Sequence, residues 1–236
     1  TSVIITHQLY PKSPIFQKLA RRKIAALLRN FDRVWIPDFE HQKESLSGAL
    51  SHPGNELTTY LGPLSQVENH EMPPPEKDLA VLLSGPEPNR TQLEQTLLQF
   101  LSDKKVSGYF IRGTESPFNH SSPEQMEVID LAYGADLSMK LSACKKVIAR
   151  GGYSTIMDLY CLNKPGMLIP TTGQPEQEYL AKWNNSNQLF CFASEQDAHL
   201  HAILEDFLSD PKPQTDIKKR SASQQLLLNA FKELSI

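Results

Sequence analysis

The chain alternates short runs of apolar residues with polar or helix-like intervals. From residue 79 onward, the apolar runs cover residues 79–83, 109–111, 146–149, 167–169 and 190–192. Short continuous runs of this kind are typical of strands that are buried on both faces. Because strands that alternate with helices form parallel sheets, this half is predicted to be a doubly wound α/β domain. Two helices are predicted at its end, over residues 198–207 and 224–234.

The first third of the chain shows the same alternation in shorter form. Residues 3–6, 33–37 and 58–64 predict strands, while residues 38–56 are polar. Residues 14–29 predict a helix, because apolar positions recur there near helical spacing: Ile15, Leu19, Ile24, Leu27 and Leu28. These elements predict a second, smaller α/β unit.

A proline-rich stretch separates the two halves. Residues 72–77 are Met-Pro-Pro-Pro-Glu-Lys, a stiff and extended sequence without a core-forming pattern. With 236 residues, the chain is long enough for two domains. We therefore predict one domain over residues 1–72 and a second over residues 73–236.

Composition narrows the class of protein. The formal net charge of −3 argues against a general nucleic-acid binder, which normally carries a strongly basic surface. The three cysteines, Cys144, Cys161 and Cys191, are widely spaced and form no C-x-x-C pair, so neither disulfides nor a zinc site is indicated. No apolar run approaches the roughly 18 residues that a membrane span needs, and no signal peptide begins the sequence. A reduced, cytoplasmic setting is the expectation.

The stretch with the most chemical information runs from Ala149 to Asp158. It predicts the end of a strand, a glycine turn at Gly151 and Gly152, and the start of a helix. Glycines let the backbone approach a ligand closely, and the helix directs free N–H groups and the positive end of its dipole at phosphate. Asp158, one turn into the helix, is placed to accept ribose hydroxyl protons. The stretch therefore predicts nucleotide binding; a plain glycine turn capped by Ser154 is the structural alternative.

Together with Lys164-Pro165 and the loop from Gln174 to Gln177, this stretch resembles the donor-binding half of the GT-B glycosyltransferases, most closely family 28. The positions that match the family's motif are Arg150, Gly151, Gly152, Ser154, Thr155, Asp158, Glu176 and Gln177. Two residues depart from it: Asp158 stands where the family usually has Glu, and Glu176 stands where close relatives have the first of two Gln residues.

The resemblance implies a GT-B-like α/β fold, in which a doubly wound, Rossmann-like domain binds a nucleoside-diphosphate-sugar, with UDP-sugar as the expected form. The remnant of an acceptor-side α/β domain would precede it. The implied contacts are Gly151, Gly152, Ser154 and Thr155 with phosphate, Asp158 with ribose, Glu176 and Gln177 with the sugar, and residues 135–139 with the base. Neither a metal nor a cofactor is implied for the hexosyl transfer. Because the family's usual catalytic base would lie before residue 1, the chain is expected to be a fragment that is inactive alone.

Other loops are predicted to end at the same edge of the sheet, where doubly wound folds bind their ligands. They add Ser84, Gly85, Arg90 and Gly113 to the candidate donor-binding residues. Pro86 and Pro88 remove two N–H groups that phosphate would otherwise use, so Arg90 or Arg150 would supply positive charge to the leaving diphosphate. The alternative for this loop is a proline-stiffened turn with Asn89 as the helix N-cap.

His7 ends the first predicted strand and is the candidate for contact with an acceptor; a partly buried polar side chain is the alternative. The histidines show no metal-ligand spacing, because His199 and His201 lie two residues apart and therefore on different helix faces.

The segment from Lys12 to Arg29 carries six basic residues and no acidic one. A basic amphipathic helix can bind an anionic membrane surface, in which case the acceptor would be lipid-linked or close to a membrane. A solvated face over an ordinary core stripe is the alternative.

The sequence thus predicts a glycosyltransferase that uses a nucleoside-diphosphate-sugar, with an acceptor that the sequence does not identify. Two rivals remain open: a sugar-nucleotide epimerase or hydrolase of the same fold, and a noncatalytic nucleotide-binding protein.

Overall fold

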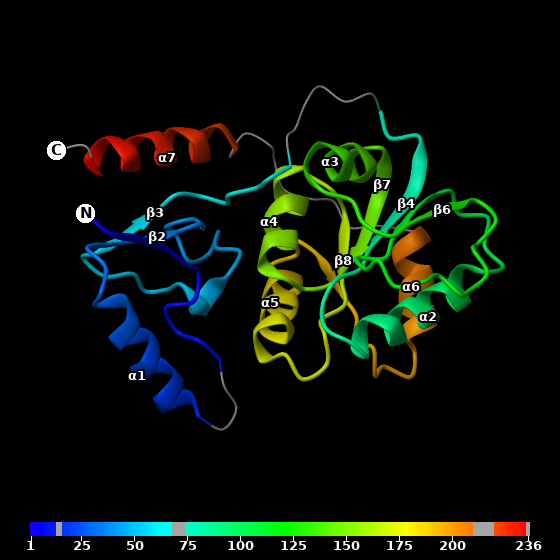
Figure 1. The fold of residues 1–236 in the computed structure, drawn as a ribbon, viewed down its shortest axis with the longest axis horizontal. Helices are drawn as coiled ribbons and strands as arrows, with labels where there is room; N and C mark the ends of the chain where they lie inside the picture. Colours follow the sequence, from blue (N-terminus) through cyan, green and yellow to red (C-terminus); the bar gives the residue numbers. More distant parts are fainter. Residues whose placement is uncertain (13–15, 68–73, 210–219, 235–236) are drawn as a thin grey trace. The chain divides into compact units, whose positions relative to one another are not determined.

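The computed structural model describes residues 1–12, 16–67, 74–209 and 220–234. By its internal contacts the chain divides into two compact units, one formed by residues 1–65 and 216–236 and the other by residues 66–215 (Figure 1). The predicted domain boundary between residues 72 and 73 lies outside the described residues.

The first unit is built on a three-stranded parallel sheet in the order β1-β2-β3. Its strands are β1 (Val3–Ile5), β2 (Arg33–Ile36) and β3 (Thr58–Tyr60), as the apolar runs predict, and α1 (Gln17–Leu28) connects β1 to β2. The C-terminal helix α7 (Arg220–Leu234) also belongs to this unit, because Ala230 is buried with Trp35 and Leu61. The sequence analysis placed this helix in the second domain, over residues 73–236. The division into an acceptor-side domain and a donor-binding domain stays a prediction.

The polar stretch between β2 and β3 folds around one buried carboxylate. Asp38 accepts hydrogen bonds from the backbone N–H groups of Leu46 and Ser47, both 2.9 Å long, and from the Ser45 hydroxyl at 2.6 Å. A short 3₁₀ helix, η1 (Gly48–Leu50), follows, and Leu46 and Leu50 are fully buried beside it. The carboxylate satisfies the backbone that a loop without regular structure would otherwise leave unbonded.

The second unit is a six-stranded parallel sheet in the order β6-β5-β4-β7-β8-β9. Its strands in chain order are β4 (Lys77–Leu82), β5 (Gly108–Ile111), β6 (Met126–Ile129), β7 (Cys144–Ala149), β8 (Gly166–Leu168) and β9 (Cys191–Phe192). This order is 3-2-1-4-5-6 when the strands of the unit are counted from one, which is the order of the doubly wound nucleotide-binding sheet. The predicted fold class is therefore confirmed.

In the described part of the second unit, five helices cover the two faces of this sheet. They are α2 (Asn89–Leu101), α3 (Gly134–Ser142), α4 (Tyr153–Cys161), α5 (Pro175–Ser186) and α6 (Leu200–Ser209). Figure 1 shows α2 and α6 on one face and α3, α4 and α5 on the other. The core on the first face joins Leu93 and Leu97 of α2 to Leu204 and Phe207 of α6.

The parallel strands β4 and β7 are the two central strands of the six-stranded sheet, and the direction in which later strands are added to the sheet reverses between them. From there the chain winds outward to β6 on one side and to β9 on the other. The loops after β4 and β7 therefore diverge, and the crevice between them is where doubly wound folds bind ligands. This switch point locates the candidate site.

Candidate functional site

The turn after β7 brings a helix N-terminus to the switch point. Gly152 is the N-cap of α4 and, as a glycine, has no side chain that could cap the helix. The first turn of an α-helix holds N–H groups without partners inside the helix, and they carry the positive end of the helix dipole. A phosphate placed there would receive both hydrogen bonds and favourable charge.

The two glycines of this turn have different surroundings. A Cβ on Gly151 would lie 3.2 Å from the carbonyl oxygen of Gln177, so the missing side chain lets α5 pack close to the turn. A Cβ on Gly152 would meet only the Thr155 hydroxyl oxygen, at 3.9 Å. Gly152 has φ −71° and ψ 144°, an extended conformation that any residue can adopt. Neither packing nor backbone strain therefore requires glycine at position 152, and a ligand contact by Gly152 stays a prediction.

The remaining predicted residues of α4 lie at different depths. Ser154 is exposed and Thr155 is half-buried, both in the first turn next to Gly152. Asp158 follows one turn later and is only 4% exposed. The phosphate contacts of Ser154 and Thr155 and the ribose contact of Asp158 all stay predictions.

The loop after β8 is held in place by the start of α5. The Gln177 amide oxygen accepts a hydrogen bond from the Thr171 backbone N–H at 2.9 Å, and its amide nitrogen donates to the Gln174 side chain at 2.6 Å. Glu178 accepts from the backbone N–H of Gly173 at 3.1 Å. Gln177 thus shapes this loop in the present structure, and Glu176 lies half-buried beside it.

The loop after β4 approaches the loop after β8. Ser84 and Gly85 are exposed, and Gly85 has φ +106°, a conformation that favours glycine. A Cβ on Gly85 would lie 3.5 Å from the Thr171 hydroxyl oxygen, which is buried and has no hydrogen-bond partner within the described ranges. Asn89 donates from its side-chain amide to the Thr172 carbonyl at 3.3 Å. Sequence reasoning did not identify Thr171, because a lone threonine after a strand carries no local signal.

Arg150, directly after β7, is 1% exposed. Its guanidinium donates to the carbonyl oxygens of Asn89 at 2.6 Å and of Ile169 and Pro170 at 3.4 Å, and it forms an ion pair with Glu195. Burial lowers the pKa of Arg150 to about 10. The two terminal nitrogens of the guanidinium are occupied by protein groups, while its Nε is buried without a hydrogen-bond partner within the described ranges. Direct contact with a diphosphate stays a prediction.

Arg90, the other predicted cation, is also buried and paired. It forms ion pairs with Glu87, at 2.6 Å, and with Glu94. Burial opposes the charge of Arg90, but these carboxylates outweigh it and raise its pKa. The Arg90 side chain thus lies between two carboxylates, those of Glu87 and Glu94. The spacing of the two glutamates, three residues before and four residues after Arg90, was the sequence signal for this pairing.

Glu87 occupies the end of α2 that the sequence analysis considered for phosphate. Its carboxylate accepts a hydrogen bond from the Thr91 backbone N–H at 3.2 Å. Although desolvation opposes the change, bonds from Thr91 and Arg90 hold the pKa of Glu87 below its usual value. The N-terminus of α2 therefore already has a carboxylate partner.

The network continues from Arg90 to the end of β5. Glu94 also accepts from Arg112 at 2.8 Å, and Arg112 forms an ion pair with Asp130. An open cavity of about 440 Å³ lies along these side chains. Gly113 follows Arg112 with φ +70°, and a Cβ there would lie 2.3 Å from the Leu83 carbonyl oxygen. The close approach of two backbones therefore explains Gly113 without a ligand.

The first unit contains His7 and a separate cavity. His7 is half-buried just after β1. The cavity, of about 350 Å³, is lined mainly by apolar side chains of α1, β2 and nearby loops: Leu9, Tyr10, Ala25, Leu28, Arg29, Val34, Asn55 and Leu57.

The described residues form neither a metal-binding cluster nor a membrane-spanning helix. Within the described ranges, no group of three or more His, Cys, Asp or Glu side chains is arranged to hold a metal ion. Of the helices that the structure describes, none has the length and apolar character needed to cross a bilayer.

Several solved glycosyltransferases share this fold. The calicheamicin glycosyltransferase CalG4 superposes with a TM-score of 0.62 at 12% identity, over 99% of this chain and 66% of that one. MurG of Acinetobacter baumannii gives 0.55 at 14% identity, over 88% and 57%. The spinosyn rhamnosyltransferase SpnG, complexed with thymidine diphosphate, gives 0.52 at 11% identity, over 87% and 58%. The chain thus spans 57 to 66% of the length of these three proteins, and at these identities the likeness shows the GT-B fold alone.

Sequence comparisons settle the family. The search of curated proteins found no match. The family model described as the glycosyltransferase family 28 C-terminal domain matches residues 84–234. That match covers more than half of the chain and includes the loop after β4, the glycine turn and α5. The chain therefore belongs to glycosyltransferase family 28 and contains the C-terminal domain of that family.

Proposed function

We propose that the intact protein transfers a hexosyl group from a nucleoside-diphosphate-sugar, with UDP-sugar as the expected form, to an acceptor hydroxyl. The six-stranded unit binds the sugar nucleotide in this proposal. The observation that carries it is the N-terminus of α4 at the switch point, with an open Gly152 and an exposed Ser154 beside it. Membership of family 28 supports the same reading.

The chemistry follows from charge. When the bond between sugar and diphosphate breaks, negative charge grows on the leaving oxygen, and preorganised N–H groups stabilise it. The N-terminus of α4 would supply them, so the sugar nucleotide is a substrate and needs no cofactor in this proposal. A base must also take the proton of the acceptor hydroxyl, and His7 is the candidate on this chain.

Titration with nucleotides tests the first part. A nucleotide that binds only the folded chain raises its melting temperature. Because the proposed donor is a UDP-sugar, we expect UDP to raise the melting temperature of this chain more than GDP or TDP. At a concentration near 100 Kd, the stabilisation would be about 2.7 kcal/mol, which corresponds to a shift of about 5–10 °C. Differential scanning fluorimetry with the three diphosphates and their sugar conjugates measures it. A larger shift with TDP or GDP would assign a different base to the donor nucleotide. The absence of any shift in a folded sample would contradict the proposal.

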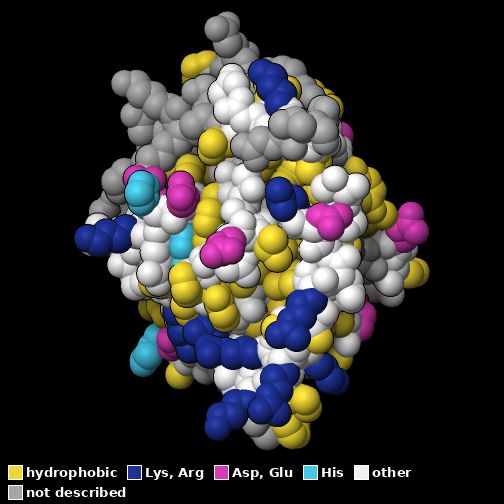
Figure 2. All heavy atoms as spheres, turned by 90° about the vertical axis from the view of Figure 1, so that its left-hand side faces the viewer, with side chains coloured by type: hydrophobic (Ala, Val, Ile, Leu, Met, Phe, Trp, Pro, Cys, Tyr) yellow, Lys and Arg dark blue, Asp and Glu magenta, His cyan; other side chains and the backbone are white. Residues whose placement is uncertain are grey.

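We also propose that α1 binds an anionic lipid surface and that the protein is cytoplasmic and membrane-peripheral. None of the twelve residues of α1 is buried. Leu19 and Leu27 are exposed, as is Phe16 just before the helix, and exposed basic residues lie between them. Figure 2 shows Lys and Arg side chains gathered with hydrophobic ones on this face of the chain. Exposed apolar and basic side chains on one helix match an anionic bilayer surface, and an acceptor near that surface would be lipid-linked.

Reversing two charges on α1 tests the membrane proposal. Each basic residue near such a surface contributes about 1 kcal/mol, so Lys18→Glu with Arg22→Glu should weaken binding to phosphatidylserine-containing vesicles at least about tenfold. Co-sedimentation with vesicles of 30% phosphatidylserine, on the order of a cytoplasmic leaflet, measures it against pure phosphatidylcholine. The matched control, Lys43→Glu with Lys105→Glu, changes net charge equally at exposed sites outside α1. Equal losses for both pairs would leave only a general charge effect and contradict a role of α1.

A further inference from the structure

The buried guanidinium of Arg150 lies where the ends of four strands meet. It follows β7, and its partners belong to the loops after β4, β8 and β9. We propose that Arg150, held by Glu195, is a positioning residue that fixes the two loops flanking the N-terminus of α4 and so preassembles the donor site. This inference rests on the proposed function, because it concerns the same site.

Each contact of Arg150 fixes a different segment. The bond to Asn89 O, at 2.6 Å, reaches the first residue of α2. The bonds to Ile169 O and Pro170 O reach the chain just beyond β8, and the ion pair reaches Glu195 beyond β9. Arg150 thus connects segments that are far apart in the sequence, and a side chain that bonds only to its neighbouring loop would not connect them.

The contact geometry requires arginine. A guanidinium presents five N–H donors in a planar fork, whereas an ammonium is a point charge on a flexible stem. With 1% of Arg150 and 14% of the Glu195 side chain exposed, little water is available to replace a lost contact. Lysine at position 150 would keep the charge but could not reach both sides of the crevice at once.

The fixed loops are the ones that border the proposed phosphate site. Asn89 bonds to the Thr172 carbonyl at 3.3 Å, so the loops after β4 and β8 are joined to each other as well as to Arg150. The Thr171 hydroxyl is placed in this way opposite Gly85. Loss of the Arg150 contacts would release both loops, while the turn at Gly151 and Gly152 keeps its own backbone geometry.

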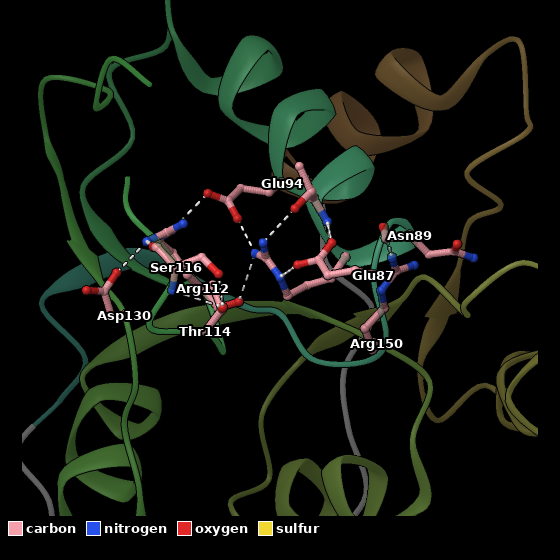
Figure 3. Close-up of polar contacts among 10 residues, drawn as sticks. Glu87, Asn89, Glu94, Arg112, Thr114, Ser116, Asp130 and Arg150 are labelled. Atoms are coloured by element: carbon pink, nitrogen blue, oxygen red, sulfur yellow. Dashed lines mark hydrogen bonds and ion pairs between the residues drawn. The ribbon is translucent and has the colours of Figure 1, made fainter. Parts of the chain in front are cut away.

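The test compares Arg150→Lys and Glu195→Gln with the control Arg112→Lys. Arg112 is an equally buried, ion-paired arginine at the end of β5, and Figure 3 shows it beside Glu94 and Asp130, apart from Arg150. We expect Arg150→Lys to weaken the binding of the nucleoside diphosphate that stabilises the unaltered chain about tenfold to hundredfold, because small displacements of binding groups have effects of this size. Glu195→Gln, which keeps the shape and removes the charge, should fall between. Arg112→Lys should lower the melting temperature without changing the nucleotide affinity.

A second readout needs no nucleotide. Amide hydrogen exchange of residues 84–89 and 169–174 should accelerate in Arg150→Lys and stay unchanged in Arg112→Lys. Unchanged exchange and unchanged affinity in a folded Arg150→Lys sample would overturn the positioning role. Accelerated exchange in a chain whose unaltered form binds no nucleotide would instead refute the proposed function and leave the fixing of the loops standing. Equal losses of affinity in Arg150→Lys and Arg112→Lys would reduce Arg150 to a stabilising residue.

Discussion

Replacing Gly152 by valine is expected to weaken nucleoside diphosphate binding at least about 100-fold, or about 3 kcal/mol, because charge-assisted hydrogen bonds at the N-terminus of α4 would be lost. The valine side chain would fill the space next to the first turn, where the phosphate must approach the backbone. Isothermal titration calorimetry of the variant with UDP measures the loss.

The fold should tolerate this change. Gly152 has an extended backbone, and a Cβ there meets nothing closer than 3.9 Å. Valine is a poorer N-cap than glycine, and this costs no more than about 1 kcal/mol. A nearly normal melting temperature together with lost binding would therefore assign Gly152 to ligand approach.

The neighbouring glycine supplies the matched control. Alanine at Gly151 would place its Cβ 3.2 Å from the Gln177 carbonyl oxygen, so α5 must shift and the melting temperature should fall. If Gly152→Val bound the nucleotide as well as the unaltered chain, the N-terminus of α4 would not be the phosphate site. If both variants lost stability equally, position 152 would be a packing position.

The central strands were predictable because burial on both faces makes their sequences continuously apolar. The runs at residues 79–83, 146–149 and 167–169 correspond to β4, β7 and β8 within two residues at each end. The edge strand β6 (Met126–Ile129) was not predicted, because the exposed Glu127 interrupts its apolar run. The apolar run at residues 190–192, by contrast, did predict β9 (Cys191–Phe192) at the opposite edge of the sheet, so the difference lies in the local sequence of β6.

The burial of polar side chains through contacts with residues distant in the sequence could not be predicted from the pattern of apolar residues. The stretch over residues 38–56 is polar, yet Asp38 is fully buried and organises the loop through Ser45 and Ser47. The pattern of apolar residues does not register a loop whose core is a carboxylate. The same limit applies to Glu195, whose partner Arg150 lies 45 positions earlier in the sequence.

The glycine turn could be predicted as a site because its properties are local. A strand, two glycines and a helix start occur within a few residues, and the structure brings the same residues to the switch point. The directions of Arg90 and Arg150 depend instead on which loops meet at the edge of the sheet. A cation near a predicted phosphate site is therefore a weak signal, since buried carboxylates and carbonyls compete for it.

Replacing Glu94 by alanine is expected to destabilise the second unit by about 3–5 kcal/mol, because it leaves two buried arginines without their shared carboxylate. Glu94 is 1% exposed and bridges Arg90 and Arg112, whose side chains are 4% and 3% exposed. Two like charges would then face each other with little water between them. Chemical denaturation measures the loss.

Two further variants separate the buried charge from charge in general. Glu205→Ala removes the carboxylate of an exposed pair with Lys104 and should cost less than about 1 kcal/mol. Arg90→Met, Glu94→Leu and Arg112→Met together remove the network, and because no buried charge is then left unpaired, stability should recover most of the loss. Recovery of UDP binding in this triple variant would show that Arg90 supports the sheet edge and supplies no charge to the diphosphate. Lost binding in a stable triple variant would support a direct role of Arg90 in the donor site. A small effect of Glu94→Ala on stability would mean that water reaches both guanidinium groups.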